Sequence, residues 1–165
     1  MADHTLSGAA ERYVERMGLL WEAEGLPRIA GRMLGYLALQ AEPATLDDLA
    51  GALGVSKASV SNDARRLERL GLIERASRPA DRRDYYAIAP DMPARVVAQK
   101  LADLERLQAA MSAASDLPET PDVVRARLGA FTAFHGRVIE HLRGLLAAFE
   151  CDGVLPPHGT APIES

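Results

Sequence analysis

The sequence predicts a mainly α fold with a small β wing, in which a winged helix-turn-helix is combined with long terminal dimerisation helices. Three observations predict it. Residues 45–70 form two short amphipathic segments around a glycine turn, residues 72–89 form two strand-like runs around a basic loop, and residues 93–150 carry apolar side chains at heptad-like spacing. A helix pair joined by a short glycine-containing turn offers its second helix to a groove or a partner surface.

Two helices are expected before this motif. An apolar stripe of Tyr13, Met17, Leu20 and Trp21 predicts a helix from about residue 8 to residue 24, which Gly25 ends. Pro27 suits the first turn of a second helix that continues to about residue 40. Its inward face would consist of Ala30, Met33, Leu34 and Leu37. Residues 1–7 are expected to be a flexible N-terminus, and residues 41–44 a short linker.

The helix-turn-helix is predicted from its capping residues. Thr45 can cap the first helix, with Asp48 at the capping-box position, and Gly54 can adopt the left-handed conformation that ends it. Ser56 can cap the second helix, which runs from Lys57 to about residue 70. Its inward face would be Val60, Ala64 and Leu67, and its outward face Ala58, Asn62, Arg65 and Arg69.

A wing follows this helix. Gly71 ends the helix, residues 72–75 read as one strand, and residues 84–89 read as another. The basic loop between them, residues 76–83, is too polar to belong to the core. Residues 27–90 together make the predicted DNA-binding lobe.

Two long helices should complete the fold. Asp91 can cap a helix that starts near Pro93 and continues to about residue 115, and Thr120 with Pro121 can start another that continues to about residue 150. The second helix carries a seam with four-three spacing: Leu128, Phe131, His135, Val138, Leu142, Leu145 and Phe149. Such a seam needs partners, so residues 8–26 and 91–150 are predicted to form a dimerisation region. Residues 151–165 should be a flexible tail.

Composition places the chain among globular proteins. It has 165 residues, 48% hydrophobic and 25% charged, which fits one domain with a substantial core. A single cysteine, no signal-peptide pattern and no apolar run of about 20 residues predict a cytoplasmic protein. The formal charge is −4, but residues 51–90 hold eight Lys/Arg against five Asp/Glu, so positive charge gathers at the predicted DNA-binding motif.

The same region resembles the MarR family of bacterial transcription regulators. The matching residues are Leu49-Ala50, Leu53–Ser56, Val60-Ser61, Leu67-Glu68, Gly71–Arg75 and Asp81–Arg83. Residues 16–31 and 84–86 look more particularly like the GbsR branch of that family. The likeness covers roughly residues 10–90, and it departs from the common pattern at Asn62, where many members carry Arg. It implies a homodimer in which terminal helices of two subunits interlock.

Candidate DNA contacts lie on the second helix and the wing. Base edges could be reached by Ser59, Ser61, Asn62 and Arg65, and phosphates by Lys57, Arg66 and Arg69. The MarR resemblance implies that Arg83 enters the minor groove, that Asp81 braces it, and that Arg78 and Arg82 contact phosphates. For these residues the alternative is a solvated helix face and a mobile charged hairpin tip. For the whole protein the alternative is a winged-helix protein–protein interaction module without DNA binding, whose basic helix and wing would contact an acidic partner.

The expected function is therefore a sequence-specific transcriptional regulator, a homodimeric repressor on a pseudo-palindromic operator that a small-molecule effector could release. Aromatic and soft side chains that could line an effector pocket are Tyr13, Met17, Trp21, Tyr36 and Phe134, although most would serve as core. His135 more often fixes helix register at such a seam than senses a ligand. No metal-ligand spacing, cofactor motif or catalytic constellation is visible, so neither a metal, a cofactor nor an enzyme is expected.

Overall fold

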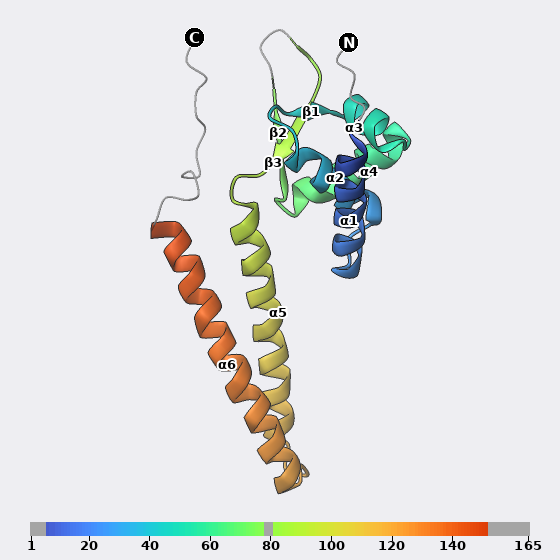
Figure 1. Ribbon diagram of the computed structural model, residues 1–165. Coiled ribbons are helices and arrows are strands. Elements are labelled where there is room, and N and C mark those ends of the chain that lie inside the picture. The colour runs from blue at the N-terminus through green and yellow to red at the C-terminus, as the bar shows by residue number, and fades with distance from the viewer. Residues whose placement is uncertain (1–5, 78–80, 152–165) are drawn as a thin grey trace. The chain divides into compact units, whose positions relative to one another are not determined.

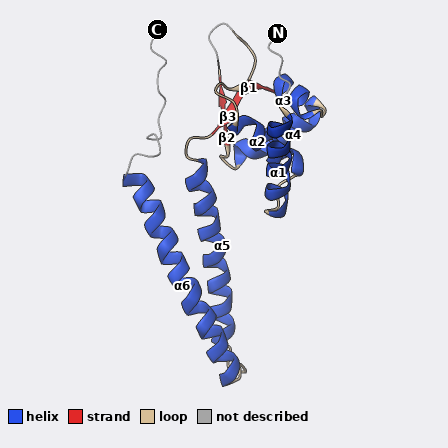
Figure 2. Cartoon of the chain, in the orientation of Figure 1, coloured by secondary structure: helices blue, strands red, loops and turns tan. Residues whose placement is uncertain are grey.

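The computed structural model describes residues 6–77 and 81–151, and the chain divides into two compact units, residues 1–92 and 93–165. Helices dominate both units, and the strands lie in the first unit only among the described residues (Figures 1 and 2). The predicted mainly α fold with a small β wing is confirmed. None of the described helices combines the length and the apolar content that a bilayer span requires.

Helices α1 (Gly8–Ala23) and α2 (Arg28–Ala38) pack closely against each other. The approach depends on glycine, because a Cβ on Gly31 would lie 2.8 Å from the Trp21 Cβ and one on Gly35 would lie 2.9 Å from the Met17 Cβ. The inward face predicted for α2 is confirmed, since Ala30, Met33, Leu34 and Leu37 are buried. The stripe predicted for α1 is wrong in part. Leu20 is 54% exposed, while Val14 and Gly18 are buried.

The helix-turn-helix consists of α3 (Leu46–Leu53) and α4 (Lys57–Arg69). The predicted capping box is present, because the Thr45 hydroxyl accepts from the Asp48 amide and the Asp48 carboxylate accepts from the Thr45 amide. Gly54 has φ 65°, the left-handed conformation expected of it. The Ser56 hydroxyl accepts from the Ser59 amide at 3.2 Å and caps α4. The local signals therefore fix both ends of the turn.

A three-stranded antiparallel sheet forms the wing, with strand order β1-β3-β2. Its strands are β1 (Ala44–Thr45), β2 (Ile73–Ala76) and β3 (Tyr85–Ile88). In the central strand Tyr85 pairs with Thr45 on one side and with Ala76 on the other. Residues 41–44 were expected to be only a linker, but Ala44 begins β1 and so ties the start of α3 to the wing.

The second unit is a pair of long helices, α5 (Met92–Ser115) and α6 (Asp122–Cys151). They are joined by the bond from Gln108 Nε2 to the Thr132 carbonyl at 3.0 Å and by the ion pair between Arg143 and Glu105. Thr120 does not cap α6 as predicted, because its hydroxyl donates to the Ala114 carbonyl instead. Ile139 is the one residue of this unit that is buried among those described.

The predicted seam of α6 is open to solvent in the single chain. Phe131 is 47% exposed and Leu145 is 44% exposed, and the other seam residues are half-buried. His135 is also half-buried, with its ring edge-on to Phe134, and Nδ1 has no hydrogen-bond partner among the described residues. The division into a dimerisation region and a DNA-binding lobe stays a prediction. Within the chain, α1 belongs to the same unit as α2 and the wing.

Candidate nucleic-acid interface

Helix α4 presents a polar face because its other face is anchored in the core. Val60, Ala64 and Leu67 are all 0% exposed, which fixes the rotation of the helix about its axis. On the opposite side Ala58, Asn62, Arg65 and Arg69 are exposed. The predicted outward face of the helix is therefore the observed one. A helix anchored in this way keeps its exposed side chains directed away from the domain, as recognition by a groove requires.

The candidates for base contact are not equivalent. Ser59 and Ser61 are half-buried, and the Ser59 hydroxyl lies 2.9 Å from the Ser56 hydroxyl within the cap of α4. Asn62 and Arg65 are exposed, and Arg65 Nη2 donates to Asn62 Oδ1 at 2.5 Å. That bond uses the Asn62 side-chain oxygen as its acceptor, so the NH₂ group of Asn62 can still donate to a base edge. Asn62 and Arg65 thus form a donor-rich pair at the centre of the exposed face.

The cations flanking this pair differ in their freedom. Lys57 Nζ lies 2.8 Å from Asp47 Oδ1, so a phosphate would have to compete with that carboxylate. Arg66 Nε is 3.8 Å from Asp63 Oδ1, a looser ion pair. Arg69 forms no ion pair within the described part of the chain. Of these three candidate phosphate contacts, Arg69 is thus the least restrained.

Asp63 is an acidic residue on the inward side of α4. It is 8% exposed, and burial raises the pKa of its carboxyl group while the Arg66 charge lowers it in part. Partial burial without a strong ion pair disfavours the charged carboxylate.

Arg75 has a structural role that the sequence reasoning missed. Its guanidinium lies 3.3 Å from a Glu68 carboxylate oxygen and 3.4 Å from an Asp84 carboxylate oxygen, and its Cζ lies 5.8 Å from the centre of the Tyr86 ring. Electrostatic interaction with Tyr86, followed by Glu68 and Asp84, raises the pKa of Arg75. Arg75 therefore holds the wing to the end of α4, although the charge count treated it as available to DNA.

The wing holds Arg83 in a bonded cluster. Arg83 Nη2 lies 2.6 Å from Asp81 Oδ2, and Arg83 Nε donates to both Asp81 oxygens at 3.1 and 3.0 Å. The hydrogen bonds from Arg83, followed by the one from Tyr85, hold the pKa of Asp81 well below its usual range. Arg82 is exposed, and Arg78 lies outside the described residues. Asp81 thus pairs with Arg83, and the role of this pair in DNA binding stays a prediction.

The candidate effector residues do not form one group. Tyr36 is 1% exposed and belongs to the core, which raises its pKa. Met17 and Trp21 are half-buried against the glycines of α2, and Tyr13 is 38% exposed on α1. Phe134 lies on α6 in the second unit and is 56% exposed.

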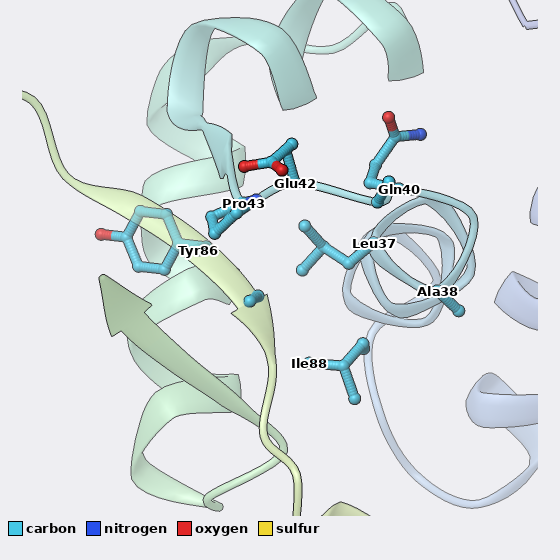
Figure 3. A pocket seen from close by; sticks show the side chains of 9 residues that line it. Leu37, Ala38, Gln40, Glu42, Pro43, Tyr86 and Ile88 are labelled. Atoms are coloured by element: carbon cyan, nitrogen blue, oxygen red, sulfur yellow. The ribbon is translucent and has the colours of Figure 1, made fainter. Parts of the chain in front are cut away.

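The sequence reasoning also missed an open hollow of about 400 Å³ beside the C-terminal end of α2. Leu37, Pro43 and Ile88 point toward its centre, and Gln40 and Glu42 lie at its rim (Figure 3). No group of three or more metal-ligating side chains occurs among the described residues. The hollow is largely apolar and offers no constellation for chemistry.

Known proteins resemble the chain over this interface and beyond it. Residues 24–84 match the sequence model of the MarR family. The chain is 34% identical to the HTH-type transcriptional regulator MmpR5 of Mycobacterium tuberculosis over 139 residues, 84% of this chain and 78% of that protein.

Two further similarities are also to transcriptional regulators. The HTH-type transcriptional repressor OpcR of Bacillus subtilis is 29% identical over 83 residues, 50% of this chain and 45% of that protein. A crystal structure of a transcriptional regulator superposes with a TM-score of 0.67 at 28% identity, covering 86% of this chain and 98% of the other. The match to MmpR5 extends well past the wing, which a shared helix-turn-helix motif alone would not produce.

Proposed function

Because this chain belongs to the MarR family of transcriptional regulators, we propose that it binds a pseudo-palindromic operator as a homodimer and represses transcription from it. The relatives are regulators and not enzymes. The observation that carries the proposal is the exposed polar face of α4, with Asn62 and Arg65 at its centre, beside a wing that holds Arg83. In this proposal the protein acts in the cytoplasm, and its more particular likeness to the GbsR branch stays a prediction.

The proposed contacts divide into two kinds. Asn62 and Arg65 would read base edges in the major groove, while Arg69 and Arg82 would hold the backbone phosphates. Arg83 would enter the adjoining minor groove, whose negative potential attracts a guanidinium. Base contacts of this kind discriminate by about 1–3 kcal/mol each, so the α4 pair would supply most of the sequence preference.

The homodimer is supported by the second unit. Among the described residues of that unit only Ile139 is buried, while Phe131, Phe134 and Val123 are each about half exposed or more. A helix pair that leaves so many large apolar side chains in solvent lacks a core of its own. A second copy of the chain is the proposed partner, since it would also place two copies of α4 about one helical turn (~34 Å) apart on DNA.

Repression and effector release complete the proposal. The related OpcR is a transcriptional repressor. We propose that this chain likewise blocks transcription while it occupies its operator, until an effector lowers its affinity. An effector that binds better to a dimer with another spacing of its lobes would shift the population away from the DNA-binding geometry. Effector contacts are proposed for Tyr13, Met17 and Trp21 of α1, whereas Tyr36 belongs to the core and Phe134 to the other unit.

A direct test measures binding to DNA that flanks the chain's own gene. Fluorescence anisotropy should show binding by the dimer. The logarithm of its affinity should fall linearly with the logarithm of the salt concentration, because binding releases counterions from the phosphates. Unrelated DNA of equal length is the control. Absence of binding at low salt would reject the proposal and favour the alternative, a winged-helix module that binds another protein.

Two substitutions test the proposed major-groove and minor-groove contacts separately. Asn62→Ala should relax the preference at one position of each half-site, measured by selection from a random library, since a lost amide donor leaves one base edge unread. Arg83→Ala should weaken binding with little change in major-groove preference. An unchanged selected sequence for Asn62→Ala, or an unchanged affinity for Arg83→Ala, would remove that residue from the interface.

A further inference from the structure

Tyr85 lies at the base of the wing and contacts Asp81 and Arg83, but the proposed DNA contacts give it no role. It is 5% exposed, yet its hydroxyl group is bonded to both charged residues. The hydroxyl donates to Asp81 Oδ2 at 2.7 Å and accepts from Arg83 Nη2 at 3.0 Å. The Arg83 Cζ also lies 5.6 Å from the centre of the Tyr85 ring. Tyr85 is thus bonded to both members of the ion pair.

These bonds select which edge of Arg83 faces outward. A guanidinium has five N–H groups: one on Nε, two on Nη1 and two on Nη2. Asp81 accepts from Nε and from Nη2, and the Tyr85 hydroxyl accepts from Nη2 as well. Among the described residues nothing accepts from Nη1, and the Arg83 side chain is 63% exposed. The Nη1 edge is therefore the one left for a ligand.

Tyr85 also connects this cluster to the helix-turn-helix. It is the residue of the central strand that pairs with Thr45 in β1, and Thr45 caps α3. Both the amide and the hydroxyl of Thr45 donate to Asp48 Oδ2, at 2.9 and 2.7 Å. The loop residues Asp81 and Arg83 are thus bonded to the first residue of the strand that pairs with the start of the helix-turn-helix.

We propose that Tyr85 is a positioning residue for DNA recognition: its hydroxyl clamps Asp81 and Arg83 so that the wing presents the Nη1 edge of Arg83 to the minor groove. The inference rests on the proposed function and deepens it. Asp81 alone could pair with Arg83 in several orientations, because an exposed ion pair leaves the side chains free to reorient. A buried hydroxyl bonded to both groups removes that freedom before DNA arrives, which lowers the entropic cost of binding.

The test is a substitution that removes only the hydroxyl oxygen of Tyr85. Tyr85→Phe should keep the buried ring and the fold but should weaken binding to the DNA flanking the chain's own gene about threefold to tenfold per half-site, as expected for a single net hydrogen bond. Tyr86→Phe is the matched control. It deletes the same atom from the next residue of β3, whose ring lies against Arg75 rather than Arg83, and it should leave the affinity unchanged.

A double-mutant cycle decides whether Tyr85 acts through Arg83. In the Arg83→Ala background, Tyr85→Phe should change the affinity less than about twofold, because the group that it positions is absent. Equal losses in the two backgrounds would show that Tyr85 supports the fold only, and an affinity equal to wild type would show that the hydroxyl does nothing. Either result would overturn the inference.

A measurement without DNA separates this inference from the proposed function. The Asp81 carboxyl carbon can be titrated by NMR, and Tyr85→Phe should move its pKa up toward the ordinary range, whereas Tyr86→Phe should not. An unchanged titration in Tyr85→Phe would refute the clamp even if the protein binds DNA. If the wild-type protein binds no DNA but the variants show the expected titrations, the proposed function is refuted, while the clamp of Asp81 and Arg83 by Tyr85 stands.

Discussion

Arg69 and Arg75 lie six positions apart and count equally in the charge of the DNA-binding segment, but the structure separates their roles. Arg69 is exposed on the outward face of α4, whereas Arg75 is held by the carboxylates of Glu68 and Asp84. Replacing Arg69 by Ala should therefore remove one phosphate contact per half-site. Each such contact contributes about 0.9 to the slope of log affinity against log salt, so a dimer should lose about 1.8 from that slope.

This difference is large enough to measure. Between 50 and 200 mM salt the wild type should lose about tenfold more affinity than Arg69→Ala, since a slope difference of about 1.8 acts over a fourfold change in salt. Anisotropy titrations with the same DNA at several salt concentrations give the slope directly. Arg75→Ala is the control. It should lower the thermal unfolding midpoint but leave the slope within about 0.3 of wild type. Equal slope changes in the two variants would refute the assignment of Arg75 to the wing–helix contact.

Three other predictions concern packing, titration and assembly. Gly31→Ala should destabilise the fold by about 1–3 kcal/mol in urea unfolding, because its Cβ would lie 2.8 Å from the Trp21 Cβ; Gly51→Ala, with nothing within 4 Å, should be neutral or stabilising. Burial raises the pKa of Asp63, so the folded state holds its proton more tightly than the unfolded state, and this contribution to stability falls as pH rises above about 4. The stability of Asp63→Asn relative to wild type should thus increase from pH 4 to pH 7, and a constant difference would contradict the shift. Phe131→Glu should yield monomers in sedimentation velocity, because it places a charge on the exposed seam of α6.

The parts of the fold that sequence could predict are those with local causes. Caps at Thr45 and Ser56 and the left-handed Gly54 depend on residues within a few positions of each other, and all are present as expected. The exposed face of α4 followed from apolar spacing alone. Strand β1 was missed because two residues carry too short a pattern to be recognised.

What could not be predicted depends on partners distant in the chain. The side of α1 that packs is set by Gly31 and Gly35 in the next helix, which admit Met17 and Trp21 closely and leave Leu20 outside. Arg75 reads as one more cation until the fold brings Glu68 and Asp84 beside it. Tyr85 reads as a core strand residue, and its ring is buried, but its hydroxyl contacts charged groups that no spacing rule connects to it.

Ion pairs within the chain reduce the number of unpaired cations on the candidate interface. Of the seven described Lys and Arg residues between positions 51 and 90, four are held in ion pairs: Lys57, Arg66, Arg75 and Arg83. Phosphate attraction alone, which acts on any sequence, therefore has fewer free charges to use than the local count implies. In the proposed complex Asp47 would restrain Lys57 and Asp63 would restrain Arg66, because each carboxylate competes with the phosphates for its cation. In a chain with a net charge of −4, this restraint would weaken nonspecific binding more than binding at the operator.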